Sequence, residues 1–267
     1  MSVKTPSEIL ESSVAAARRK ASLRQQPYRL LVLSIMAGAF IALGGALSIM
    51  AGFGFPGVAA DNPSIQKLLS GLAFPIGLVL TVVLGAELFT GNNAMLIPAL
   101  TRKQILPGDV VYNWTIVWLG NFVGSLLFGF LLIKCTGTLD ASPYHEGICN
   151  MASTKASLPW AVTFMRGIGA NWCVCLAVWL AMATSTLPGK VLACWIPVAA
   201  FVILGYEHCV ANMFFLPTAM MLGADISFSA LVVNIVAATF GNILGGALFV
   251  GTAHAYAHAT KQPPLPE

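Results

Sequence analysis

Long apolar runs separated by short polar stretches make up most of the chain. The runs lie near residues 30–52, 68–100, 110–134, 158–184, 191–222 and 227–256. A helix needs about 20 apolar residues to cross the hydrocarbon core of a bilayer, so each run is long enough for one transmembrane helix. The short alternating segments of a membrane β-barrel are absent from this pattern. The sequence therefore predicts an all-α membrane protein with six spans.

The runs at 68–100 and 191–222 are too long for one plain helix, and both contain polar residues near their middle. The first includes Glu87-Leu88-Phe89-Thr90-Gly91-Asn92-Asn93, and the second includes Glu207-His208-Cys209-Val210-Ala211-Asn212. Irregular backbone at membrane depth is tolerated only where protein buries it or water lines it. We therefore expect spans 2 and 5 to be broken helices whose ends meet near the bilayer centre.

Two short elements occur twice at nearly the same separation. Leu84-Gly85-Ala86-Glu87 resembles Leu204-Gly205-Tyr206-Glu207, and Gly120-Asn121-Phe122-Val123-Gly124 resembles Gly241-Asn242-Ile243-Leu244-Gly245. Each half of the chain holds three spans, so the second half enters the membrane upside down. The prediction is two inverted repeats, about 30–134 and 158–256, an architecture in which the pathway lies near the midplane between the halves. The Gly-Asn elements are interpreted as close helix contacts.

Composition excludes several classes of protein. Only 9% of the 267 residues are charged, 57% are hydrophobic, and the mean hydropathy is +0.81. Soluble domains carry about 25% charged residues. A soluble enzyme, a disordered chain and a nucleic-acid binder are therefore excluded, and the few charges inside the apolar runs become candidates for function.

The first 29 residues differ from the rest of the chain. Ile9, Leu10, Val14 and Ala17 recur at helical spacing, and basic residues crowd the stretch that follows them. This pattern predicts an amphipathic basic helix at the membrane surface. The domains are then an N-terminal helix at 1–29, a six-span channel domain at 30–256 and a tail at 257–267.

Basic residues are distributed unevenly between the two sides of the predicted membrane protein. With six spans, both termini share a side that carries Lys4, Arg18, Arg19, Lys20, Arg24, Arg29, Arg102, Lys103, Lys190 and Lys261. The other side carries Lys67, Lys134 and Lys155. The positive-inside rule therefore predicts that both termini are cytoplasmic. The net charge of +4 is explained by this topology and does not indicate an acidic partner.

The six cysteines have no zinc-binding or redox spacing, so the sequence predicts no metal and no cofactor. Four lie inside apolar runs, where cysteine serves as a small packing residue: Cys173, Cys175, Cys194 and Cys209. Cys135 and Cys149 flank the predicted outer loop and either stay free or form a disulfide.

Glu87, Glu207 and His208 bring ionisable chemistry into the membrane. The two carboxylates are interpreted as structural groups that accept hydrogen bonds from amides freed at the helix breaks. His208 is the stronger functional candidate, because histidine can gain or lose a proton near neutral pH.

The chain resembles the formate/nitrite transporter family over residues 5–258. The resemblance is carried by Glu87-Leu88-Phe89-Thr90-Gly91, Asn171-Trp172-Cys173-Val174-Cys175-Leu176-Ala177 and Gly205-Tyr206-Glu207-His208-Cys209-Val210-Ala211-Asn212-Met213. It implies an aquaporin-like homopentamer in the bacterial inner membrane, in which each subunit has a pore for formate, nitrite or hydrosulfide. It is not expected to be an enzyme.

The resemblance also implies roles for individual residues. His208 is the central pore histidine, Thr90 the loop threonine, Asn212 a polar partner near the histidine, and Lys155 a vestibular lysine. The outer constriction falls on Phe74 and Phe201, and the inner one on Leu78, Leu88, Asn171 and Val174. Without the resemblance, the apolar residues among these would pass as core or lipid-facing positions, and Lys155 as an interfacial residue that extends to water.

The resulting mechanism is a hypothesis of proton-linked passage. Lys155 draws the anion inward, and His208 supplies a proton or a positive field, because a neutral acid crosses an apolar ring at far lower cost than an anion. Arg166 is assigned to a helix or subunit contact. Formate is the leading substrate as the commoner substrate class, and nitrite is the alternative. Thr90-Gly91-Asn92 and Arg166-Gly167 resemble the nitrite-type branch as much as the formate-channel branch, and the 223–226 connection is shorter than the insertion common among formate channels. Remoter alternatives are a neutral-solute pore, although paired Asn-Pro-Ala loops are absent, and an intramembrane hydrolase.

Overall fold

The computed structural model describes residues 3–259, and every regular element in that range is helical. The first half contains α1 (Pro6–Ser22), η1 (Leu23–Gln25), α2 (Pro27–Phe53), α3 (Pro56–Asp61), α4 (Pro63–Ala73), α5 (Ile76–Leu84), α6 (Phe89–Met95), α7 (Ile97–Thr101), α8 (Pro107–Phe128) and η2 (Gly129–Lys134). The second half contains α9 (Tyr144–Ala156), α10 (Trp160–Met182), α11 (Leu187–Ile203), α12 (Cys209–Met221), α13 (Phe228–Gly246), η3 (Ala247–Thr252) and α14 (Ala253–Ala257). The all-α prediction is confirmed.

Within residues 3–259, five continuous helical stretches are long and apolar enough to cross a membrane. They are Pro27–Phe53, Pro63–Leu84, Pro107–Lys134, Trp160–Met182 and Phe228–Ala257. The predicted run at 191–222 is divided between two shorter apolar helices, α11 and α12. The chain is thus a multi-pass membrane protein, whereas six spans in two inverted repeats with broken helices 2 and 5 stay a prediction.

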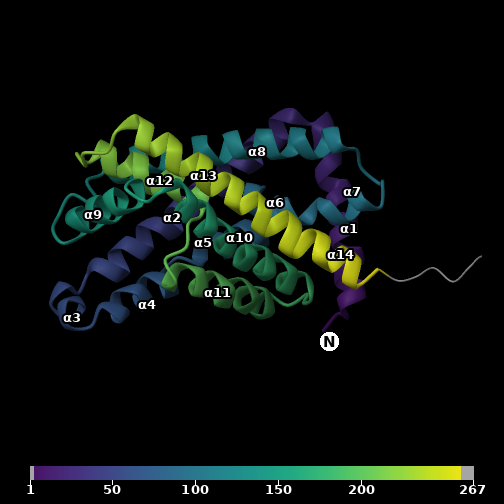
Figure 1. Ribbon diagram of the computed structural model, residues 1–267, viewed down its shortest axis with the longest axis horizontal. Helices are drawn as coiled ribbons and strands as arrows, with labels where there is room; N and C mark the ends of the chain where they lie inside the picture. Colours follow the sequence, from purple (N-terminus) through teal and green to yellow (C-terminus); the bar gives the residue numbers. More distant parts are fainter. Residues whose placement is uncertain (1–2, 260–267) are drawn as a thin grey trace, which may run out of the picture.

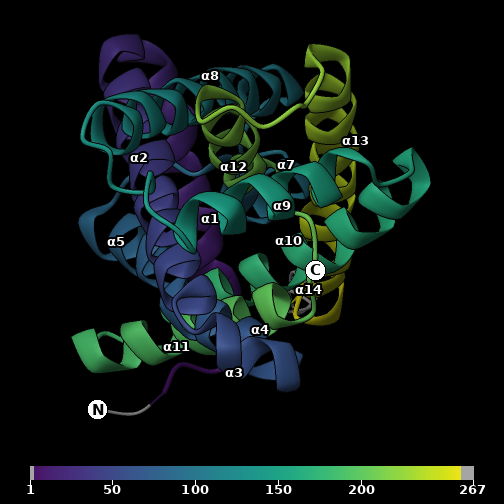
Figure 2. The same ribbon diagram turned by 90° about the vertical axis from the view of Figure 1, so that its left-hand side faces the viewer.

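The helices form an elongated bundle. In Figure 1, α3, α4 and α9 lie at one end of the long axis, and α1, α7 and α14 lie at the other. Viewed along that axis, α2 lies on one side of the bundle and α13 on the other, and α8 runs along the top (Figure 2). The ends of the bundle are therefore formed by short helices and loops, and its length by the apolar helices.

Glycine allows the long helices to pack closely at two crossings. A Cβ atom at Gly124 of α8 would collide with the carbonyl oxygen of Ile35 in α2. A Cβ atom at Gly245 of α13 would collide with the carbonyl oxygen of Ile168 in α10. The packing interpretation of the Gly-Asn elements agrees with this geometry.

The N-terminal helix α1 packs on the protein itself. Val14 and Ala17 are buried in one cluster with three residues from elsewhere in the chain. These are Leu96 directly before α7, Ala99 in α7 and Val110 in α8. The sequence predicted that the apolar face of this helix rests at the membrane surface, whereas most of that face is covered by the chain's own helices. The two loop cysteines, Cys135 and Cys149, are free. Most of the predicted tail at 257–267, with Lys261, lies outside the described residues.

Candidate functional site

Two short non-helical segments lie inside the bundle, one between α5 and α6 and one between α11 and α12. Gly85 follows α5 with φ of 73°, and Gly205 lies beyond α11 with φ of 70°. This left-handed conformation strains residues that carry a Cβ atom and suits glycine, which commonly ends helices in this way. The repeated Leu-Gly element of the sequence therefore marks the two places where a helix stops.

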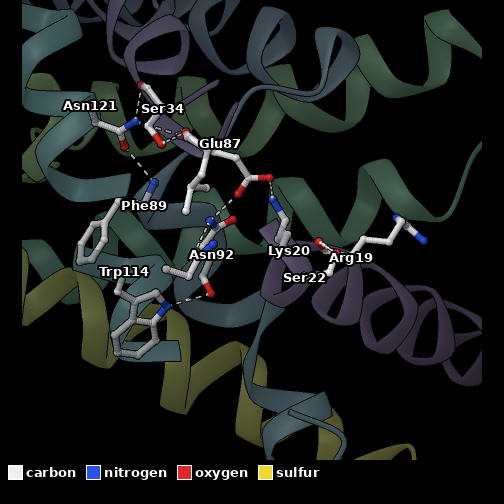
Figure 3. Close-up of polar contacts among 11 residues, drawn as sticks. Arg19, Lys20, Ser22, Ser34, Glu87, Phe89, Asn92, Trp114 and Asn121 are labelled. Carbon is white, nitrogen blue, oxygen red and sulfur yellow. Dashed lines mark hydrogen bonds and ion pairs between the residues drawn. The ribbon is translucent and has the colours of Figure 1, made fainter. Parts of the chain in front are cut away.

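Asn121 and Asn242 satisfy the backbone groups that these segments leave unpaired. The side-chain oxygen of Asn121 accepts the Phe89 N–H at 2.9 Å, and its amide donates to the carbonyls of Glu87 at 2.9 Å and Ser34 at 2.8 Å (Figure 3). These groups are buried, and a buried backbone group without a partner is costly. One side chain thus joins the segment after α5 to α2 and α8.

Asn242 makes the matching contacts in the second half. It accepts the Cys209 N–H at 2.8 Å and donates to the carbonyls of Glu207 at 3.0 Å and Gly167 at 2.8 Å. The two asparagines therefore occupy equivalent places at the start of α6 and of α12.

The buried carboxylate of Glu87 accepts hydrogen bonds from two side chains. Lys20 of α1 donates to it at 2.8 Å and Asn92 of α6 at 2.7 Å (Figure 3). Asn92 also donates to the Asn113 side-chain oxygen at 2.8 Å. Amides at the break were expected to bond this carboxylate, but the Phe89 N–H bonds Asn121 and the Glu87 N–H bonds the Leu33 carbonyl.

The carboxylate of Glu207 has the same set of partners. Lys155 of α9 donates to it at 2.8 Å and Asn212 of α12 at 2.6 Å. Asn212 also donates to the Asn234 side-chain oxygen at 2.8 Å. Asn212 was expected near the histidine through its polar side chain, and that side chain instead bonds Glu207 and Asn234.

Sequence reasoning missed Lys20, Asn92, Asn113 and Asn234. One signal was available for Asn92, because it precedes Asn212 by the same 120 positions that separate Glu87 from Glu207. Lys20 gave no such signal, since it is one of several basic residues in the N-terminal segment. Lys20 is the partner of Glu87 because of the way α1 packs against the bundle.

His208 lies at the start of α12 and makes two side-chain hydrogen bonds. Its Nδ1 accepts the Ala211 N–H at 3.1 Å, and its Nε2 lies 2.9 Å from the Thr90 hydroxyl. Because Nδ1 is an acceptor, the proton of the neutral ring is on Nε2, which then donates to Thr90. The two residues come from different halves of the chain and are both buried.

Aromatic rings stack beside this pair. The rings of His208 and Phe201 lie 5.7 Å apart with 25° between their planes. Phe201 and Phe74 meet edge to face at 5.7 Å. The predicted outer-constriction residues and the histidine therefore form one contiguous group.

A cavity of about 480 Å³ extends from this group toward α9. Its lining includes Phe74, Phe201, His208, Asn212 and Lys155. Arg166 also lines it, and within residues 3–259 no ion pair involves its side chain.

A second cavity, of about 770 Å³, opens toward α1. Leu78, Leu88, Glu87 and Lys20 line it. Phe74 lines the first cavity, and Leu78, about one helical turn later, lines the second. The rise of a helix over these four residues is roughly 6 Å, so the two cavities come close together at this point. We call the first the α9 cavity and the second the α1 cavity.

Asn171 and Val174 are buried and line neither cavity. The Asn171 amide donates to the carbonyls of Thr90 at 3.2 Å and Asn242 at 2.6 Å. Asn171 therefore holds the backbone at Thr90 in place without lining either cavity. Within residues 3–259, no group of three or more His, Cys, Asp or Glu side chains could hold a metal ion.

Both cavities carry an excess of positive side chains. The α1 cavity holds one carboxylate, Glu87, with Lys4, Arg19, Lys20, Arg29 and Lys190. The α9 cavity holds one carboxylate, Glu207, with Lys67, Lys155 and Arg166. Charge of one sign in a cleft concentrates ions of the other sign. Both cavities thus attract small anions.

The chain is similar to known proteins in sequence and in fold. The family model described as Formate/nitrite transporter matches residues 7–256. The chain is 37% identical to the formate channel BtFdhC of Bacillus thuringiensis, with 95% of each chain covered. A solved FNT family ion channel aligns with a TM-score of 0.85 at 32% identity, covering 94% of this chain and 98% of that one.

A pentameric formate channel solved with formate bound aligns with a TM-score of 0.75 at 30% identity, covering 89% of this chain and 99% of that one. These relatives are named as transporters and channels, which agrees with the prediction that the chain is not an enzyme. The family match over nearly the whole chain also confirms the resemblance drawn from the sequence motifs. The chain belongs to the formate/nitrite transporter family.

Proposed function

We propose that the chain is a channel for small monovalent weak-acid anions, with formate as the leading substrate and protons moving with it. The observation that carries the proposal is the arrangement of the two cavities. Each has an excess of positive charge, and between them lie apolar side chains and one titratable group, His208. Positive cavities recruit an anion, and the apolar residues hinder its passage in charged form.

His208 is proposed to supply the proton. In the resting state the ring is neutral, because its Nδ1 accepts the Ala211 N–H. A proton taken from the α9 cavity converts the ring to imidazolium, which breaks that hydrogen bond. Transfer of one proton to formate returns the ring to the neutral form, and formic acid crosses the apolar residues. The acid releases its proton in the α1 cavity.

Lys155 and Thr90 assist this step in the proposal. Lys155 lies at the wall of the α9 cavity and is paired with Glu207, so the excess positive charge that attracts the anion comes from Lys67 and Arg166. In the proposal, the Lys155 ammonium donates a further hydrogen bond to the anion once it is inside. Thr90 accepts from His208, and its hydroxyl proton is available to a passing carboxylate. Phe74, Phe201, Leu78 and Leu88 form the apolar barrier, and Asn171 and Val174 support it.

The membrane arrangement is also a proposal. Matching contacts at Asn121 and Asn242, and again at Glu87 and Glu207, support two inverted repeats of three spans with breaks in spans 2 and 5. The larger number of basic residues on the α1 side supports cytoplasmic termini in the bacterial inner membrane. The similarity of the chain to a pentameric formate channel supports a pentamer.

Flux through reconstituted protein tests the substrate. Proteoliposomes holding the purified chain should take up labelled formate faster than protein-free vesicles and should not take up labelled glycerol faster. Unlabelled nitrite added in excess ranks it against formate in the same assay. Equal stimulation of glycerol and formate uptake would contradict the anion channel and favour a neutral-solute pore.

A further inference from the structure

A third cavity adjoins the α1 cavity at Ser22 and lies where the N-terminal segment meets the loop between α7 and α8. Its volume is about 360 Å³, and its lining includes Arg18, Arg24, Lys103, Gln104 and Asp109. In Figure 1 the α7–α8 loop is at the same end of the bundle as α1. We call it the α7–α8 loop cavity.

The cavity lining carries more positive than negative side chains. Asp109 is its one carboxylate, and it is fully used: one oxygen accepts from Arg24 at 3.0 Å and the other from the Leu106 N–H at 3.0 Å. Arg24 is also held over the Tyr112 ring at 5.4 Å. Arg18 and Lys103 form no ion pair within residues 3–259. Two cations therefore line the cavity without a counter-charge.

Lys103 is held in place by an unusual backbone conformation. It is the one residue besides glycine with a positive φ, 56°, in the part of the chain that the structure describes. The Lys103 N–H donates to the Leu100 carbonyl and the Gln104 N–H to the Ala99 carbonyl, which ends α7 in the manner that favours glycine. A lysine at this position keeps a cation at the cavity despite the strain.

Apolar surface adjoins the cavity on the side of α8. Leu106, which lines the cavity and directly precedes α8, is 67% exposed, and Val111 in the first turns of α8 is 63% exposed. A ligand that fits this site has a compact anionic group that binds the cations and an apolar group that contacts α8. Phospholipids have this chemistry, and basic pockets at the cytoplasmic ends of membrane helices bind anionic head groups.

We propose that the α7–α8 loop cavity binds the phosphate of an anionic phospholipid, with its acyl chains along α8. Arg18 and Lys103 supply the unpaired charges, and Arg24 supplies a third cation whose position Asp109 and Tyr112 fix. A bound lipid in this position bridges the N-terminal segment and α8. The site shares Ser22 with the α1 cavity but no charged residue with either cavity of the proposed pathway.

Native mass spectrometry of the full-length protein in detergent tests this proposal. Phosphatidylglycerol should remain bound and phosphatidylcholine should not. The double variant Arg18→Gln/Lys103→Gln should bind phosphatidylglycerol about thirtyfold more weakly, as expected for the loss of two cations near a lipid surface. The matched control Arg19→Gln/Arg29→Gln removes two cations that form no ion pair within residues 3–259 and that line the α1 cavity instead, so it should bind phosphatidylglycerol like the parent protein.

Three results would overturn the proposal. Equal loss in both double variants would mean that overall charge, and not this cavity, holds the lipid. Equal retention of phosphatidylcholine would remove the role of head-group charge. Displacement of the lipid by millimolar inorganic phosphate would mean that the cavity takes free phosphate rather than a phospholipid.

Discussion

His208 combines two hydrogen bonds that one imidazole can make together only in its neutral form. Nδ1 accepts from Ala211 and so caps α12, while the Nε2 proton is directed at Thr90. A change at this residue therefore affects helix capping as well as any proton transfer. A variant that tests proton transfer alone has to keep an acceptor at the cap, and asparagine does so.

The stability of the first turn of α1 depends on the protonation state of Glu8. The Thr5 N–H and hydroxyl donate to its carboxylate at 2.7 and 2.9 Å, which lowers the pKa of Glu8 from its usual 4.5. Because the pKa is lower in the folded state, the contribution of Glu8 to α1 is present above pH 4.5 and is lost as the pH falls through the lowered value.

Hydrogen exchange in the first turn of α1 measures this effect. Relative to intrinsic rates, exchange should accelerate as the pH falls below 4.5 in the parent protein. The variant Glu8→Gln has no carboxylate to titrate, so its protection should be weaker at neutral pH and nearly independent of pH across this range. The same acceleration in both proteins would exclude Glu8 as its cause.

At the scale of elements, two asparagines connect the ends of α6 and α12 to neighbouring helices. Asn121 has three buried backbone partners contributed by α2, the segment after α5, and α6. Asn242 has three in the equivalent places. The positions of Thr90 and His208 depend on these contacts, because each lies within a few residues of a bonded backbone group.

Replacing Asn121 should therefore destabilise the protein more than an ordinary polar-to-apolar change. Asn121→Leu leaves the Phe89 N–H and the Glu87 carbonyl buried without partners, which costs roughly 2–4 kcal/mol. Thermal unfolding in detergent should show a clear fall in Tm. The control Asn150→Leu changes an exposed asparagine of α9 and should leave Tm nearly unchanged; equal Tm values for the two variants would contradict the assigned role.

The crossings of the long helices make a related prediction. Gly124→Ala places a methyl group against the Ile35 backbone, so α2 and α8 have to separate and Tm should fall. Gly57→Ala is the matched control, because an added methyl group there meets nothing within 4 Å. A Tm for Gly124→Ala equal to that of the control would show that the crossing tolerates separation.

The sequence pattern predicts the apolar helices well, because hydrophobic runs of membrane length have few other solutions. It places the interruptions near Gly85 and Gly205, which the repeated Leu-Gly element marks. It does not predict that α1 packs against α7 and α8, since an amphipathic basic helix fits a membrane surface equally well. Lys20 was missed for this reason: only the packed position of α1 selects it from its basic neighbours as the partner of Glu87.

At the scale of the whole molecule, charge and apolar surface alternate along the proposed pathway. The α9 cavity and the α1 cavity are both positive, and the group of Phe74, Phe201, Leu78 and Leu88 between them is apolar. This alternation favours anions over cations in the cavities and neutral molecules over ions at the barrier. A weak acid satisfies both preferences if a proton is available between them.

The pH dependence of formate uptake by proteoliposomes tests proton-linked passage through His208 most directly. The parent protein should take up labelled formate when the outside is more acidic and should carry protons inward with it. His208→Asn keeps an acceptor for the Ala211 N–H but cannot relay a proton, so it should retain a Tm close to that of the parent and lose the proton-coupled uptake. Unchanged uptake by His208→Asn with an unchanged pH profile would contradict the account.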